Sequence, residues 1–61
     1  MSENEQLLRL FNALDSAFNE AWTLSGRYPS STNWQAFLIT SDAFHTIKDE
    51  CVKRGLLIEI N

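Results

Sequence analysis

One stretch of the chain, residues 2–26, carries more apolar surface than a short protein can easily cover. If this stretch is helical, as its caps and spacing predict, one side of the helix holds the following apolar residues: Leu7, Leu10, Phe11, Leu14, Ala17, Phe18, Ala21, Trp22 and Leu24. At about 100° per residue they span roughly 200°, whereas a surface helix needs an apolar stripe of only a little over about 100°. Something else must cover the excess, and this requirement limits what the chain can fold into.

The chain has 61 residues, which is enough for a single small domain over residues 1–61. A monomer of this size buries only about 60% of the surface of its unfolded chain. Disulfides, a metal, oligomerisation or very efficient helix packing usually make up the shortfall. Cys51 is the only cysteine, so it has no partner for an internal disulfide and no second thiolate for a zinc cluster. We therefore expect oligomerisation or tight packing.

Composition favours a folded protein that binds another protein. Hydrophobic residues make up 44% of the chain, and they include two Trp, four Phe and one Tyr, whereas disordered chains are poor in aromatics. The start of the chain is acidic where a signal peptide is basic, and no apolar run reaches the roughly 18 residues that span a bilayer; we expect a cytoplasmic protein without a membrane partner. The net charge of −3 works against non-specific DNA binding, which needs clustered Lys and Arg.

The ends of the first helix are marked by local signals. Ser2 and Glu5 have the spacing of a capping box, which predicts that the helix begins near Glu3. Gly26 can adopt the left-handed conformation that ends a helix, and Pro29 prevents the helix from resuming. We therefore expect the first helix to end at about residue 25.

The second half of the chain is also predicted to be helical. Thr32 and Gln35 repeat the capping-box spacing. Residues 40–42 form a good cap and turn sequence that a helix also tolerates, so one helix and two helices both remain open. We favour a break, with Ser41 as the cap of a third helix that ends at Gly55. The residues after it, 56–60, predict a strand or an extended tail that could pair with a second subunit.

The residues that could act in catalysis or bind a metal have ordinary structural explanations. His45 and Asp49 could form an oriented base or two metal ligands on one helical face, but a solvated face with charge pairs explains them better. Cys51 falls on the same side as Phe44, which is typical of a small buried thiol. Ser41 has no histidine at a spacing that would activate it, and no glycine-rich phosphate loop is present. We therefore expect a non-enzyme with no cofactor, metal or catalytic residue.

Apolar residues recur through the second half of the chain with a spacing found in one DNA-binding family. The residues at its core positions are Phe37, Ile39, Phe44, Ile47 and Cys51, and they are followed by Arg54-Gly55-Leu56-Leu57. By these residues Trp34–Ile60 resembles the helix–turn–helix and first wing strand of winged-helix repressors. Trp34 and Leu38 stand where that pattern has small residues. The resemblance implies DNA binding, and these residues would face the DNA: His45, Thr46, Lys48 and Lys53.

A second resemblance is one of kind. Short acidic helical proteins without an enzymatic motif are similar to the accessory proteins encoded in early regions of lambda-like phages. This similarity favours a regulatory or accessory role.

These patterns lead to one fold prediction. We expect an all-α helical hairpin with a third helix or a kinked second helix and a short extended C-terminal segment, assembled as a dimeric bundle. The predicted core consists of Leu7, Phe11, Phe18, Trp22, Trp34, Phe37, Phe44, Ile47 and Cys51. The predicted interface with a second copy consists of Leu10, Leu14, Ala17, Ala21 and Leu24.

The functional prediction is a homodimer that acts by binding an unidentified protein partner. The alternative is a DNA-binding regulator that reads DNA with the third helix. A third hypothesis is an inhibitor that mimics nucleic acid with four acidic residues of the first helix, Glu3, Glu5, Asp15 and Glu20.

Overall fold

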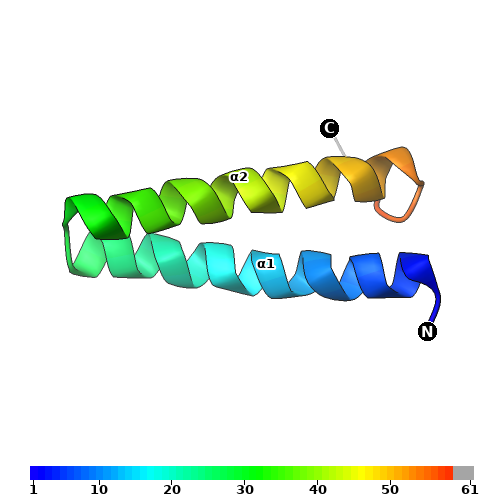
Figure 1. Cartoon of the computed structure of the whole chain (residues 1–61), viewed down its shortest axis with the longest axis horizontal. Helices are drawn as coiled ribbons and strands as arrows, with labels where there is room; N and C mark the ends of the chain where they lie inside the picture. The colour runs from blue at the N-terminus through cyan, green and yellow to red at the C-terminus, as the bar shows by residue number, and fades with distance from the viewer. Residues whose placement is uncertain (59–61) are drawn as a thin grey trace.

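The protein is a helical hairpin. The computed structural model describes residues 1–58, in which helix α1 (Glu3–Arg27) and helix α2 (Ser31–Lys53) lie side by side and run in opposite directions (Figure 1). A short loop at residues 28–30 joins them. The predicted all-helical hairpin is therefore confirmed. Among the helices of residues 1–58, none combines the length and the apolar character that crossing a bilayer requires.

Helix α1 begins where the sequence predicts and ends two residues later. The Ser2 hydroxyl accepts a hydrogen bond from the Glu5 N–H at 3.1 Å, so Ser2 is the N-cap. Gly26 lies inside the helix, and its φ is not positive, so its predicted role as the helix-ending residue is wrong. The helix ends instead at Tyr28, with φ −127° and ψ 74°, because the residue before a proline is excluded from the helical conformation by its contact with the proline ring.

Helix α2 begins one residue after Ser30, not at the predicted cap Thr32. The Ser30 hydroxyl accepts a hydrogen bond from the Asn33 N–H at 3.0 Å. The Asn33 side-chain amide in turn donates to the Tyr28 carbonyl at 2.7 Å. Asn33 thus satisfies groups on both sides of the loop, and this pair of bonds favours the earlier start.

Helix α2 is continuous through residues 40–42, so the break and the third helix favoured by the sequence are not formed. The hydroxyl of Thr40 donates to the Ala36 carbonyl one turn back, at 2.7 Å. His45 Nδ1 lies 2.7 Å from the Ser41 carbonyl, also one turn back. These side chains therefore bond within the helix, and none of them caps a new one.

The end of α2 matches its predicted position. Gly55 has a φ of +73°, and its N–H donates to the Val52 carbonyl at 3.0 Å, while the Leu56 N–H donates to the Cys51 carbonyl at 2.9 Å. This pair of bonds is a Schellman motif, which satisfies carbonyls that the helix end leaves open. Leu56, Leu57 and Ile58 form no strand, and the rest of the predicted strand, Glu59 and Ile60, lies outside the described residues.

The two helices contact each other along a single row of side chains, which we call the seam. Its residues are spaced by three and four positions and comprise Leu7, Phe11, Leu14, Phe18 and Ala21 on α1 and Phe37, Thr40, Phe44, Ile47 and Cys51 on α2. Four phenylalanines meet there: ring centroids lie 5.4 Å apart for Phe11–Phe44, 5.3 Å for Phe18–Phe44 and 5.4 Å for Phe18–Phe37. Cys51 is fully buried, as predicted.

Two residues that the sequence placed in the core lie at its rim. Trp22 and Trp34 expose 59% and 47% of their surface, although each packs one face against Phe37, with centroids 5.1 and 5.2 Å apart. A hairpin has no third element to cover them, so the prediction that Trp22 and Trp34 lie in the core is corrected.

The position of the α2 cap leads to a first prediction. Ser30→Ala should lower the free energy of unfolding by about 1 kcal/mol, because it removes the acceptor for the Asn33 N–H. Thr32→Ala is the matched control, and it should change stability by only a few tenths of a kcal/mol because an exposed residue in the first turn makes no capping bond. Urea denaturation at one fixed protein concentration measures both. A larger loss for Thr32→Ala would place the cap at Thr32 and contradict the structure.

Candidate interaction surfaces

The hairpin is one layer thick. Its Cα atoms extend over 38 × 29 × 13 Å, and their radius of gyration is 13.2 Å, whereas a compact chain of this length has a radius of gyration of about 10.5 Å. Most globular domains pack two layers around a core. Here both broad sides of the layer are open to solvent, and they are the surfaces on which a function must be sought.

One broad side is lined by small and aliphatic residues, and we call it the alanine face. A residue that directly precedes a seam position is turned by about 100° toward one side of its helix. Because the helices run in opposite directions, such residues of α1 and α2 lie on the same side of the layer. The small and aliphatic residues on this side are Leu10, Ala13, Ala17 and Leu24 on α1, the last of which precedes the half-buried Ser25, and Ala36, Ile39 and Ala43 on α2; these seven form the alanine face. They are uncharged, and Ile39 exposes 70% of its surface. Four polar residues that also precede seam positions border the face on the same side: Gln6, Glu20, Thr46 and Glu50.

The structure places the predicted interface residues on or beside this face. Leu10, Ala17 and Leu24 are exposed on it, whereas Leu14 and Ala21 are half-buried in the seam at its edge. The α2 residues of the face were missed by sequence reasoning. The signal was the spacing of Ala36, Ile39 and Ala43, which could be interpreted only after it was known which side of α2 faces α1.

The opposite broad side is rich in aromatic residues near the loop, and we call this part the aromatic face. It comprises Trp22, Trp34 and Leu38, all three of which have substantially exposed side chains, and the exposed Tyr28 of the loop lies at the same end of the hairpin. The rest of this side is mixed, with polar residues such as Asp15 and Lys48 following seam positions. The two faces therefore differ in chemistry: the alanine face is small and aliphatic, and the aromatic face is bulky.

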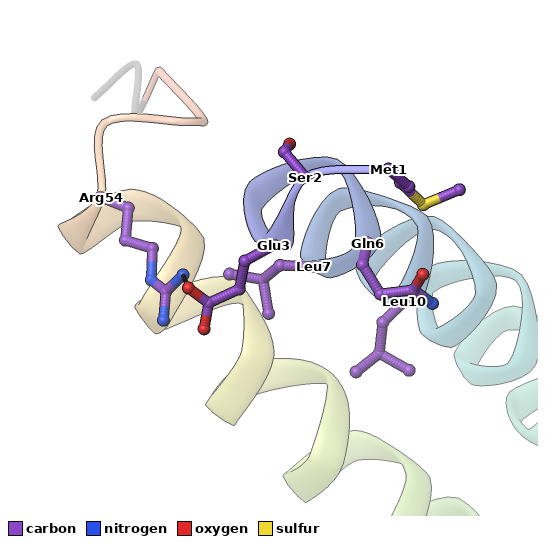
Figure 2. A pocket seen from close by; sticks show the side chains of 7 residues that line it. All are labelled: Met1, Ser2, Glu3, Gln6, Leu7, Leu10 and Arg54. Carbon is purple, nitrogen blue, oxygen red and sulfur yellow. Dashed lines mark ion pairs between the residues drawn. The ribbon is translucent and has the colours of Figure 1, made fainter.

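A pocket of about 410 Å³ opens at the end of the hairpin opposite the loop (Figure 2). Its lining consists of Met1, Ser2, Glu3, Gln6, Leu7, Leu10 and Arg54. The Arg54 guanidinium is bonded to its own chain: Nη1 lies 3.5 Å from Glu3 Oε2 and 3.0 Å from Asn4 Oδ1, and Nε lies 3.4 Å from Glu50 Oε1. The contacts with Glu3 and Asn4 fasten the end of α2 to the start of α1. Leu10 belongs to both the pocket and the alanine face.

Among the described residues, Ser41 and His45 on α2 most resemble a catalytic pair. They lie four residues apart, so the expectation that Ser41 has no histidine at a suitable spacing is corrected. Ser41 Oγ lies 3.4 Å from His45 Nδ1. The same nitrogen lies only 2.7 Å from the Ser41 carbonyl oxygen, which can only accept a hydrogen bond, so Nδ1 must carry the proton. A protonated nitrogen cannot take the proton of the Ser41 hydroxyl, so this geometry does not activate a nucleophile.

The structure also shows where the other candidate residues lie. The residues that the winged-helix resemblance assigns to DNA are not gathered on one face: Thr46 precedes the seam residue Ile47 and Lys48 follows it, so they point to opposite broad sides, and Lys48 is half-buried. The turn that the resemblance implies is a continuous part of α2. Within residues 1–58, no group of three His, Cys, Asp or Glu side chains is placed to hold a metal ion.

Comparisons with protein-family models, with curated proteins and with solved structures find no match to this chain. The functional argument therefore depends on the surfaces themselves.

Proposed function

We propose that this protein is a small non-enzymatic accessory module that forms a homodimer through the alanine face and binds another protein through the aromatic face. The observation that carries the proposal is the uncovered patch of small and aliphatic side chains on the alanine face of a hairpin only one layer thick. Exposed apolar patches of this kind mark interaction sites in soluble proteins.

The exposed area supports a second copy as the cover. One chain of 7.0 kDa exposes 4703 Å², whereas a compact monomer of that mass exposes about 4,000 Å². Two separate hairpins expose about 9,400 Å², twice the value for one chain, and a compact protein of the doubled mass exposes about 6,700 Å². Normal compactness would thus require about 2,700 Å² of buried area, which falls in the range of roughly 2,000–5,000 Å² for obligate homodimers.

The composition of the alanine face suits close helix packing. Ala13 and Ala17 let a neighbouring helix approach closely, and Leu10, Leu24 and Ile39 provide the area to be buried. Burying one Leu or Ile side chain contributes about 1.5–3 kcal/mol. The three together are comparable to the whole stability of a marginal small domain, about 5 kcal/mol, so the folded monomer is expected to depend on its partner copy.

The aromatic face supports the second half of the proposal. Dimerisation through the alanine face leaves Trp22 and Trp34 on the outside of the assembly. Trp and Tyr dominate the residues that anchor protein–protein interfaces, because they bury a large area with few rotatable bonds and a polar tip. The acidic net charge of −3 suits a protein partner better than nucleic acid.

The dimer can be tested with a pair of charge insertions on neighbouring residues. Ala17→Glu should shift the mass measured by light scattering from dimer to monomer at micromolar concentration, because a carboxylate would be buried without a partner. Ser16→Glu is the matched control: it adds the same charge one residue earlier, on the polar side of α1, and the dimer should persist. Glu20→Ala removes a charge at the border of the face and should also leave the mass unchanged.

Two results would contradict the dimer. One is a wild-type chain that is strictly monomeric at micromolar concentration and unfolds independently of concentration. The other is a dimer that Ala17→Glu leaves intact.

The role of the aromatic face predicts that assembly and partner binding can be separated. A variant with Trp22→Ser and Trp34→Ser should keep the dimer mass, because both indoles lie on the side away from the alanine face. In parallel affinity captures from a cell lysate, proteins retained by the wild-type dimer should be lost with this variant and kept by the Ser16→Glu control. Loss of the dimer in the double variant would contradict the assignment of the two faces.

DNA binding, the alternative from the sequence, has a direct test. Because α2 is unbroken and its candidate DNA-facing residues diverge, we expect no gel shift with duplex DNA even at about 50 mM salt. A shift that weakens steeply as salt rises would indicate phosphate contacts and replace the protein-binding proposal with the DNA-binding one.

A further inference from the structure

The rings of the seam set which residues of α1 and α2 lie at the same height along the hairpin. Phe18 is about equally far from Phe37 and Phe44, at 5.4 and 5.3 Å, and Phe44 is about equally far from Phe11 and Phe18, at 5.4 and 5.3 Å. At 1.5 Å of rise per residue, a position near 19 on α1 is therefore level with Ile39, and a position near 22 with Ala36.

Two hairpins can bury their alanine faces against each other in two symmetric ways. If the twofold axis runs parallel to the helices, α1 of one copy packs on α2 of the other, and every residue keeps its height. If the axis runs across the helices, α1 packs on α1 and α2 on α2, and the loops lie at opposite ends. Both arrangements are isologous and make all neighbouring helices antiparallel, so side-chain size must decide between them.

With the axis parallel to the helices, large residues meet small ones. Ile39 of the second copy lies at a height between Ala17 and Ala21 of the first. Leu24 of the first copy lies between Thr32 and Ala36 of the second. Ile39 and Leu24 thus each face a gap between smaller residues, which is the pattern by which packed layers interdigitate. Leu10, level with a position near 48, faces the stretch between Thr46 and Glu50.

If the twofold axis instead crosses the helices at mid-length, side chains of equal size meet. Around a centre at Ala17, the residue Leu10 of one copy faces Leu24 of the other at each end, while Ala17 faces Ala17 in the middle. Two leucines in contact hold the helices apart where the alanines need close approach, so a void would form at the centre. Interiors are packed at nearly crystalline density, and this arrangement is therefore disfavoured.

We infer that the dimer is a four-helix bundle whose twofold axis is parallel to the helices, with α1 of each copy packed on α2 of the other. This inference rests on the proposed homodimer and specifies its geometry. Because heights are kept, both loops lie at the same end of the bundle, and both pockets lie at the opposite end. The two copies of Trp22 and Trp34 are then presented at one end, on opposite outer sides, so the second copy makes the partner-binding end bivalent.

Cysteine crosslinking tests the arrangement. A disulfide needs Cα atoms within about 7 Å, so a tagged Ala17→Cys chain mixed with an untagged Ile39→Cys chain should give a mixed covalent dimer under mild oxidation. Each variant alone should give little covalent dimer, because residues 17 and 17, and 39 and 39, lie diagonally across the bundle. Ser16→Cys mixed with Ile39→Cys is the control and should not crosslink. Native Cys51 is fully buried and present in every chain.

Light scattering on the same samples before oxidation separates failure of this geometry from failure of the dimer itself. A dimeric mass with Ala17→Cys crosslinked to itself would overturn the parallel axis while leaving the homodimer in place. A dimeric mass with no crosslink in any mixture would show that the alanine face is not the contact. A monomeric mass would overturn both.

If Ala17→Cys does not fold, two substitutions that exchange a small and a large side chain provide the same information. Ala17→Leu should weaken the dimer at least tenfold, and adding Ile39→Ala should restore most of the loss. If the double variant does not regain dimer affinity, residues 17 and 39 are not in contact across the dimer.

Discussion

The interaction on which this structure depends is the interlocking of phenylalanine rings between α1 and α2. Phe18 inserts between Phe37 and Phe44, and Phe44 inserts between Phe11 and Phe18, with centroids 5.3–5.4 Å apart. This spacing sets both the antiparallel pairing and the register of the helices. The contact buries only one row of side chains on each helix. The apolar residues on either side of this row have no neighbour to cover them, and they form the exposed alanine and aromatic faces.

The wide apolar arc of α1 consists of three adjoining parts: the seam, the alanine face on one side of it, and Trp22 on the other. The seam contains Leu14 and Ala21, and the same two residues border the alanine face, which continues to Leu10, Ala17 and Leu24. On the other side of the seam the arc extends to Trp22. A helix that contacts one neighbour needs only the apolar residues of the seam. A helix in a four-helix bundle contacts two neighbours and needs an apolar arc close to the one observed. The apolar arc of α1 is thus as wide as a helix of the proposed four-helix bundle needs, although the single chain provides α1 with one neighbour.

Local hydrogen bonding explains which parts of the fold could be predicted from the sequence. The cap at Ser2 and the glycine at Gly55 were predicted correctly because each depends on residues within a few positions. Predictions failed where two local signals competed: Pro29 rather than Gly26 set the end of α1, and Ser30 rather than Thr32 began α2. The exposure of Trp22 and Trp34 could not be predicted, because periodicity shows which side of a helix is apolar and not how many neighbours will cover it. The α2 part of the alanine face needed the register of the seam, which is a long-range property.

The chemical difference between the two faces argues for different occupants. The alanine face consists mainly of small side chains, which offer few features by which a different protein could be bound selectively. It suits a second copy of this chain, because a twofold axis repeats every contact and can place each bulky residue against a small one twice. An aromatic face is the reverse: two indoles provide large anchors with polar tips, which bind selectively to a pocketed surface and stack poorly on an identical bulky surface. In the proposed dimer the alanine face is used for assembly and the aromatic face for recognition, and a twofold axis parallel to the helices would double the recognition surface at one end without lengthening the chain.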